Sequence, residues 1–185
     1  LTPQMLPLVE LSQEDVDAIV GAVPGGARNI EDIYPLAPLQ EGILFHHLMS
    51  ETGGDAYVLP RLFVVESRER LDNLIAALQT VIDRHAVLRS AILWDRLPRP
   101  VQVVYRQAPL PVSELTLDGT QDVPAQVKDW SKPVRQRLDI RKAPLLRLQV
   151  AKNPQHEHAW YALLQLHHIT VDHVALQIIT TDIVT

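Results

Sequence analysis

The chain has 185 residues, of which 46% are hydrophobic and 21% are charged, and these proportions are typical of one globular domain. Its net charge of -5 argues against a nucleic-acid partner, because nucleic-acid binding normally requires a basic face. The absence of cysteine excludes disulfides and thiolate metal sites, and it fits a reducing cytoplasm, where we expect the protein to work. No run approaches the roughly 20 continuous apolar residues of a membrane span, so we expect no membrane partner.

Residues 1–29 have the pattern of a leader that precedes the core. Ser12 can cap a short helix, with Asp15 as its capping-box partner. The stretch 21–26, which contains glycine and proline, ends that helix and is typical of a linker. We therefore expect the main domain to span residues 30–185.

The rest of the chain alternates between helix and strand patterns. Apolar residues at three- and four-residue spacings after Ser67 predict the clearest helix, and Pro60 places the preceding strand at a sheet edge or a bulge. The expected elements are a helix over 39–49, a strand over 57–66, the helix that opens at Ser67, strands over 88–94 and 101–105, a helix over 124–138 interrupted near Pro133, strands over 145–151 and 160–166, and a helix from 174. The last two strands are the most apolar, so both are expected at the centre of a sheet.

Two adjacent histidines, His167 and His168, follow the apolar strand over 160–166. A globular core rarely holds two imidazoles there, because burying polar groups without partners costs free energy. Adjacent strand residues point to opposite faces, so one imidazole should work at a surface or tunnel while the other packs or hydrogen-bonds behind it. This geometry disfavours a shared metal ion, and even with His173 nearby we rank acid–base chemistry above a metal site.

Asp172 has two compatible interpretations. It is well placed to cap the final helix, where its side chain would accept from an exposed backbone N–H. It can also be a buried carboxylate that pairs with an arginine and holds the loop that carries the histidines. Neither interpretation makes Asp172 a direct proton carrier.

The segment 167–172, HHITVD, resembles the His-His-x-x-x-Asp-Gly motif of the condensation domains of non-ribosomal peptide synthetases. His173 replaces the glycine of that motif, and histidine adopts the backbone angles open to glycine less readily. The key histidine and aspartate are both in place.

Other segments resemble further motifs of the same family, in the expected order. Residues 34–45, YPLAPLQEGILF, are similar to its first core motif, and residues 83–90, DRHAVLRS, to its second, with Ala86 in place of the usual glutamate. Residues 138–147, which include LDI and APLLR, resemble the segment before the central strand. On these matches the chain is identified as a member of the family.

The resemblance implies an α/β (α+β sandwich) fold: a chloramphenicol-acetyltransferase-like N-terminal lobe, with a mixed sheet flanked by helices. Condensation domains comprise two such lobes with the active site at their junction. We therefore expect residues 30–185 to form the N-terminal lobe, the C-terminal lobe to be missing, and the fragment alone to have little activity. Residues 1–29 would then follow an upstream carrier protein.

The resemblance also implies amide-forming acyl transfer. Donor and acceptor thioesters would arrive on 4′-phosphopantetheine arms of an upstream and a downstream peptidyl carrier protein, with no cofactor bound directly by this chain. His168, beside His167 in the motif, is the implied catalytic imidazole, which removes a proton from the amine or orients it. Asp172 is implied to be structural, with Arg84 and Arg89 as its candidate partners.

A second histidine pair indicates a subtype. Residues 46–55, HHLMSETGGD, resemble the extra motif of dual epimerisation/condensation domains, with one residue too many before Gly-Asp. Such domains invert the donor α-carbon, and His46 and His47 are the candidate bases. The alternative is that this segment is simply a helix C-terminus. There the two imidazoles would interact favourably with the helix dipole, and Gly53 would end the helix.

Three other functions remain open. One is a stand-alone coenzyme A-dependent acyltransferase that uses the same histidine. Another is a non-catalytic docking or scaffold lobe, and the third is a metal hydrolase.

Overall fold

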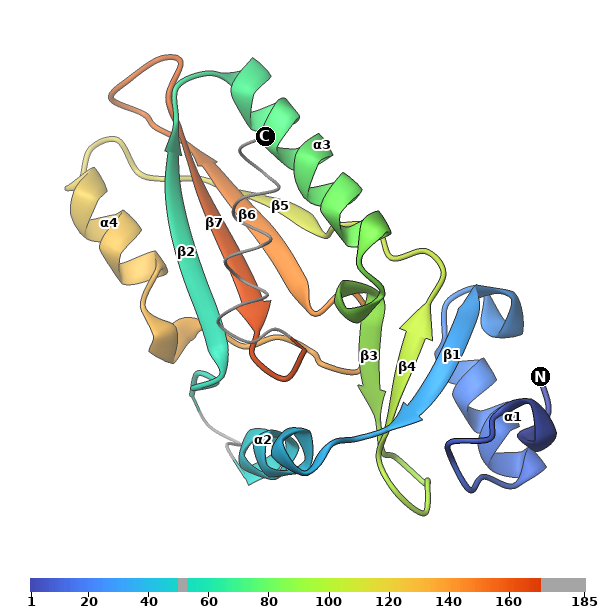
Figure 1. Ribbon diagram of the computed structural model, residues 1–185. Helices are drawn as coiled ribbons and strands as arrows, with labels where there is room; N and C mark the ends of the chain where they lie inside the picture. The colour runs from blue at the N-terminus through green and yellow to red at the C-terminus, as the bar shows by residue number, and fades with distance from the viewer. Residues whose placement is uncertain (50–52, 171–185) are drawn as a thin grey trace.

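Two β-sheets organise the residues that the computed structural model describes, 1–49 and 53–170 (Figure 1). The larger sheet has the order β2-β7-β6-β5, with strands Val58–Val65 (β2), Trp160–His167 (β7), Leu146–Lys152 (β6) and Val112–Leu115 (β5). The smaller has the order β1-β4-β3, with strands Ile30–Pro35 (β1), Val101–Tyr105 (β4) and Ser90–Leu93 (β3). Only β5 and β6 pair in parallel among these strands, so the larger sheet is mixed, as expected.

The helices are Gln13–Ala22 (α1), Pro38–Met49 (α2), Arg68–Arg84 (α3) and Val123–Trp130 (α4). Short 3-10 turns occur at Pro3–Met5 (η1), Gly26–Asn29 (η2), Ala86–Arg89 (η3) and Pro133–Arg135 (η4). Among the described residues, no helix has both the length and the apolar character that a membrane crossing requires.

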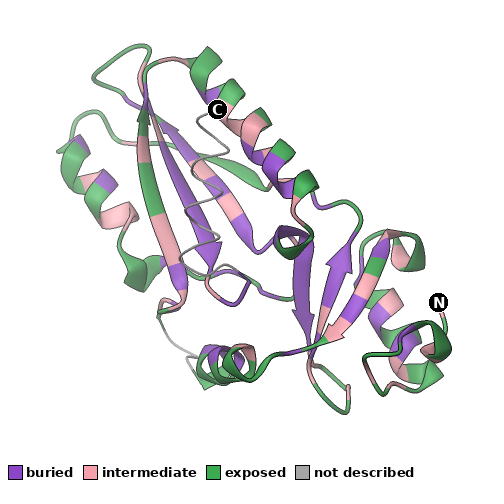
Figure 2. Ribbon diagram, in the orientation of Figure 1, coloured by how far each residue is buried: buried purple, intermediate pink, exposed green. Residues whose placement is uncertain are grey.

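The strands β6 and β7 lie at the centre of the larger sheet, which confirms their predicted position. Strand β2, which contains Pro60, is an edge strand, also as predicted. Figure 2 shows β7 buried along most of its length and β5 exposed. Because β7 is buried on both faces, any polar side chain within it must find its partners inside the protein.

Helix α3 covers one face of the larger sheet. Ser67 caps it by accepting from the Arg70 N–H at 3.2 Å, and its apolar stripe is buried against that face. The alternate β7 residues Trp160, Ala162, Leu164 and Leu166 belong to the same apolar cluster. The intervening residues of β7 therefore point to the other face.

Helix α4 and the turn η4 pack against that other face. Trp130 at the end of α4 donates from its indole Nε1 to Oε1 of Gln149 in β6, at 3.1 Å. The helix predicted over 124–138 ends at Trp130, because Pro133 cannot continue it and opens the turn η4 instead. Helices thus flank the mixed sheet on both faces.

Residues 1–29 are part of a core, which corrects the interpretation that they only precede it. The capping box between Ser12 and Asp15 forms as predicted. The apolar side of α1, with Val16 and Ile19, is buried in one cluster with residues of β1, β3 and β4. A short helix with an apolar stripe is stable only where that stripe is covered, and here the smaller sheet covers it. The boundary at residue 30 and an upstream carrier protein stay predictions.

Two strands were not predicted. Strand β1 lies where we expected only an extended entry to the helix over 39–49, and β5 consists of four exposed residues without apolar alternation. Both strands are formed by pairing with β4 and β6, respectively, rather than by a local pattern. The helix predicted from 174 lies outside the described residues.

Candidate active site

Three buried polar side chains meet at the end of β7. His167 is the last residue of that strand, His47 comes from α2, and Asp55 from the segment before β2; their exposures are 0%, 5% and 2%. Oδ2 of Asp55 lies 2.5 Å from Nδ1 of His47 and 3.0 Å from Nε2 of His167. Oδ1 of Asp55 accepts from the Tyr57 N–H at 2.9 Å. One carboxylate therefore holds two imidazoles from separate elements.

The backbone fixes the tautomer of His167. The Ile169 N–H donates to Nδ1 of His167 at 3.1 Å, so Nδ1 carries a lone pair and not a proton. The proton of the neutral ring is then on Nε2, which donates to Asp55. His167 is thus fully engaged in positioning the loop and has no nitrogen left for a substrate.

Burial and hydrogen bonding move the two pKa values in this pair downward. Burial raises the pKa of Asp55, but hydrogen bonds from His167, His47 and the Tyr57 N–H outweigh it and leave that pKa well below its usual range. Burial also lowers the pKa of His167, although the Asp55 carboxylate partly offsets this. The pair is therefore an ionised aspartate beside a neutral His167.

A metal ion fits this cluster poorly, although the three ligand atoms lie within 4.8 Å of one another. Nε2 of His167 would have to lose its proton to bind a cation. The remaining proton would then sit on Nδ1, where it would face the Ile169 N–H, and two donors repel. The hydrogen-bonded form satisfies each of these nitrogens without a metal.

Two glycines allow Asp55 to reach His47. Gly53 has a φ of +112°, a backbone angle that residues with a side chain rarely adopt. A Cβ on Gly54 would lie 2.5 Å from the backbone carbonyl of Val134, so only glycine permits this close approach to η4. The Asp55 N–H then donates to the Gln136 carbonyl at 2.7 Å. The motif with one extra residue before Gly-Asp therefore still pairs its aspartate with His47.

His168 differs from its neighbour. It follows the end of β7, its side chain is partly exposed, and its N–H donates to the Tyr57 carbonyl at 2.8 Å. Its imidazole Nδ1 is itself buried and has no hydrogen-bond partner among the described residues. The two histidines thus divide as strand alternation predicts, with His167 held in the interior and His168 left with an unused nitrogen.

The two arginines predicted as partners of Asp172 have different environments in the described part of the fold. Arg89 is buried; it donates from Nη2 to Glu31 at 2.7 Å and from Nε to the Tyr105 carbonyl at 2.8 Å. The carboxylate partner seen for Arg89 is thus Glu31, which the sequence did not indicate. Arg84 is exposed on the last turn of α3. Asp172 itself lies outside the described residues.

A buried amide network connects the cluster to β6. Nε2 of Gln165 donates to Oε1 of Gln136, and Oε1 of Gln165 accepts from Nε of Arg147 at 2.6 Å. Gln165 and Gln136 are 0% and 2% exposed. These residues were missed by the sequence reasoning, although Gln165 inside an apolar strand, two positions before His167, marks the same face.

A pocket of about 520 Å³ adjoins His47. Its lining residues are His47, Leu48, Trp94, Arg137, Leu138, Asp139, Arg141 and Arg147. His46 does not belong to this lining; it is exposed, and its ring lies 5.8 Å from Phe45 and 6.1 Å from Tyr57. Of the two predicted bases, His47 alone both lines this pocket and pairs with a carboxylate.

The lowered pKa of His167 predicts that acid destabilises the fold. The unfolded imidazole binds a proton below about pH 6.5, whereas the buried ring resists it, so the free energy of unfolding falls as the pH drops from 7 toward 5. A single such group contributes at most about 1.4 kcal/mol per pH unit. In chemical denaturation at each pH, H167Q should flatten this dependence, and the exposed-site variant H158Q should not. An unchanged slope in H167Q contradicts the assignment.

Comparison with known proteins identifies the family of this chain. A family model described as the condensation domain matches residues 30–185, which is most of the chain. The chain belongs to the condensation domain family. This confirms the resemblance to the condensation domains of non-ribosomal peptide synthetases.

Curated relatives of this condensation-domain chain are synthetases. It is 46% identical over 183 residues to malpinin synthetase of Mortierella alpina, covering 98% of this chain and 2% of that protein. It is 42% identical over 184 residues to malpibaldin synthetase of the same organism, covering 99% of this chain and 3% of the relative. The chain therefore spans a small part of the curated relatives that it matches.

Solved structures share the fold. The starter condensation domain of rhizomide synthetase RzmA superimposes with a TM-score of 0.64 at 23% identity, over 82% of this chain and 37% of that one. A structure titled SeMet-CT superimposes with a TM-score of 0.68 at 18% identity, over 96% of this chain and 39% of that one. These matches confirm the expected α/β fold.

Proposed function

We propose that this chain forms the N-terminal lobe of a condensation domain that makes peptide bonds in non-ribosomal peptide synthesis. The observation that carries the proposal is the division of labour in the motif 167–172: Asp55 holds His167, while His168 keeps an unused imidazole nitrogen. A partly exposed imidazole at the end of a buried strand, with no described hydrogen-bond partner at Nδ1, suits a group that must meet a substrate.

In the proposed reaction, the acceptor amine attacks the carbonyl carbon of the donor thioester. A C–N bond forms, the C–S bond breaks, and the proton of the amine is finally transferred to the departing thiolate. His168 removes or orients that proton, and His167 acts as a positioning residue through Asp55. Both thioesters would be carried on 4′-phosphopantetheine arms of an upstream donor and a downstream acceptor carrier protein. Asp172, Arg84 and Arg89 stay the candidate supports of the loop.

The deciding experiment replaces His168 by alanine in the complete condensation domain, supplied with loaded donor and acceptor carrier proteins. Loss of general acid–base catalysis should slow dipeptide formation by about 10²- to 10⁴-fold, followed by mass spectrometry. The control H158A removes an exposed histidine and should leave the rate unchanged. Dipeptide formation by H168A at the rate of the unaltered domain would support a non-catalytic docking lobe. Transfer to a free amine from acyl-coenzyme A, without carrier proteins, would support the stand-alone acyltransferase.

We further propose that a second lobe completes this site, so the chain by itself forms little amide. The support is its extent, because it covers 37% of the matched RzmA starter domain. Efficient dipeptide formation by the 185-residue chain alone would contradict this part of the proposal.

The pair of His47 and Asp55 favours a donor-epimerising subtype. The carboxylate accepts from Nδ1 of His47, which is the arrangement that orients an imidazole as a base, and His47 lines a pocket. His47 would remove the α-proton of the donor thioester, and the enolate would regain a proton on its opposite face.

Replacing His47 by glutamine tests this epimerisation. H47Q should abolish inversion of the donor α-carbon while condensation of a donor supplied with the inverted configuration continues. Chiral chromatography of the released dipeptide measures both, and H46Q is the matched control at the exposed neighbour. Unchanged inversion in H47Q would indicate a condensation domain that accepts a pre-set donor.

A further inference from the structure

The pocket beside His47 carries more positive than negative charge. Arg137, Arg141 and Arg147 all line it, and Asp139 is the one carboxylate among its described lining residues. Which of these cations is already neutralised decides what the pocket can bind.

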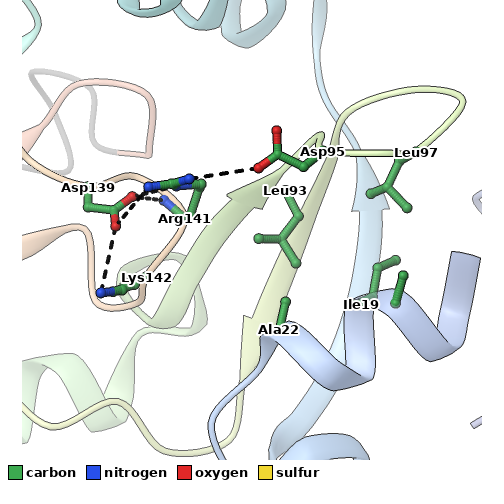
Figure 3. A pocket seen from close by; sticks show the side chains of 9 residues that line it. Ile19, Ala22, Leu93, Asp95, Leu97, Asp139, Arg141 and Lys142 are labelled. Atoms are coloured by element: carbon green, nitrogen blue, oxygen red, sulfur yellow. Dashed lines mark hydrogen bonds and ion pairs between the residues drawn. The ribbon is translucent and has the colours of Figure 1, made fainter.

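The charge of Arg141 is neutralised. Figure 3 shows its guanidinium between two carboxylates, in a neighbouring pocket of about 380 Å³. Its Nε lies 2.9 Å from Oδ1 of Asp139, and its Nη1 lies 3.7 Å from Oδ2 of Asp95. Lys142 also approaches Asp139, at 3.8 Å. Asp139 is thus shared by two cations and has no charge left for a third.

Arg147 is different, because its charge has no described counterpart. It projects from β6, is partly buried, and donates from Nε to the neutral amide of Gln165 at 2.6 Å. Burial lowers the pKa of its guanidinium, and no described carboxylate offsets that effect. A partly buried cation without a counter-charge costs free energy, so its presence in a pocket indicates a bound anion.

We propose that this pocket binds an anionic group, a phosphate or a carboxylate, against the guanidinium of Arg147. The planar guanidinium can hold either group through two parallel hydrogen bonds. Arg137, which donates from Nη2 to the His47 carbonyl at 3.2 Å, also lines this pocket. The volume of about 520 Å³ lies within the usual range for small ligands. The source of the anion rests on the proposed function. If that function holds, the anion is the phosphate of a carrier arm or a carboxylate on the donor acyl group.

The test measures binding without turnover, in the complete condensation domain, by isothermal titration with two matched pairs of probes. One pair is 4′-phosphopantetheine and pantetheine, and the other is S-succinyl-pantetheine and S-butyryl-pantetheine. The charged member of one pair should bind about tenfold more tightly than its neutral twin, because charge-assisted bidentate contacts are strong. A preference within the first pair identifies phosphate, and one within the second identifies carboxylate.

Arg147→Met should reduce the preference to within about twofold, whereas the surface variant Arg70→Met should keep it. If circular dichroism shows that Arg147→Met does not fold, Arg147→Lys is used instead. This variant should lower the preference about threefold, because lysine lacks the planar guanidinium that forms two parallel hydrogen bonds. Equal binding of charged and neutral probes in the unaltered domain, or a preference that substitution of Arg147 leaves unchanged, overturns the proposal. The titration measures binding without turnover, so its result is independent of whether His168 catalyses.

Discussion

Replacing Asp55 by alanine is expected to destabilise the condensation domain by about 3–5 kcal/mol. The change removes the one acceptor shared by His47 and His167, and also the acceptor of the Tyr57 N–H. The two imidazoles are too deeply buried for water to replace the carboxylate without a rearrangement. Urea denaturation of the complete domain measures the loss.

The matched control is D72A. Asp72 pairs with Arg68 at 2.9 Å, but the two side chains are 53% and 58% exposed. Because solvent screens such a pair, D72A should change the free energy of unfolding by less than about 0.5 kcal/mol. Similar losses in D55A and D72A would show that Asp55 does not hold the cluster together.

Replacing Gly54 by alanine is the second change with a large expected effect. The new Cβ would lie 2.5 Å from the carbonyl carbon and oxygen of Val134, and closer still to the Pro133 carbonyl oxygen. These are backbone atoms, so the segment around Gly54 must move away from η4. The hydrogen bond from the Asp55 N–H to the Gln136 carbonyl must then lengthen or break. We expect a loss of at least about 2 kcal/mol in denaturation, together with a lower condensation rate.

Gly42 provides the control for that substitution. It lies in α2, and a Cβ at this position would meet nothing within 4 Å. Because alanine favours a helix more than glycine does, G42A should raise the free energy of unfolding by about 1 kcal/mol. If G54A is tolerated as well as G42A, the close approach to η4 is not a constraint.

Local patterns predicted the elements that carry a strong periodicity. The apolar stripe of α3 and its Ser67 cap, the central strands β6 and β7, and the edge strand with Pro60 all agree with the structure. Strand β5 and the burial of α1 were missed. Both depend on a partner strand or sheet that is distant in sequence, and such partners leave no period in the local sequence.

The candidate site shows the same division. Strand alternation predicted that His167 and His168 have different environments, and it did so without any partner being known. The motif over 46–55 indicated that His47 matters, but not that Asp55 would join it to His167. Those last two residues are 112 positions apart, and only the pairing of β2 with β7 brings them together.

The amino-acid sequence by itself determined the family, the order of the main elements and the separation of the two motif histidines. These properties follow from residue types at short spacings, which act within one helix or strand. The tertiary structure alone decided that Asp55 holds two imidazoles, that Glu31 pairs with Arg89, and that Arg147 has no described counter-charge. The physical reason is that hydrogen bonding, burial and charge compensation depend on which groups meet in space, and packing between distant segments sets those meetings.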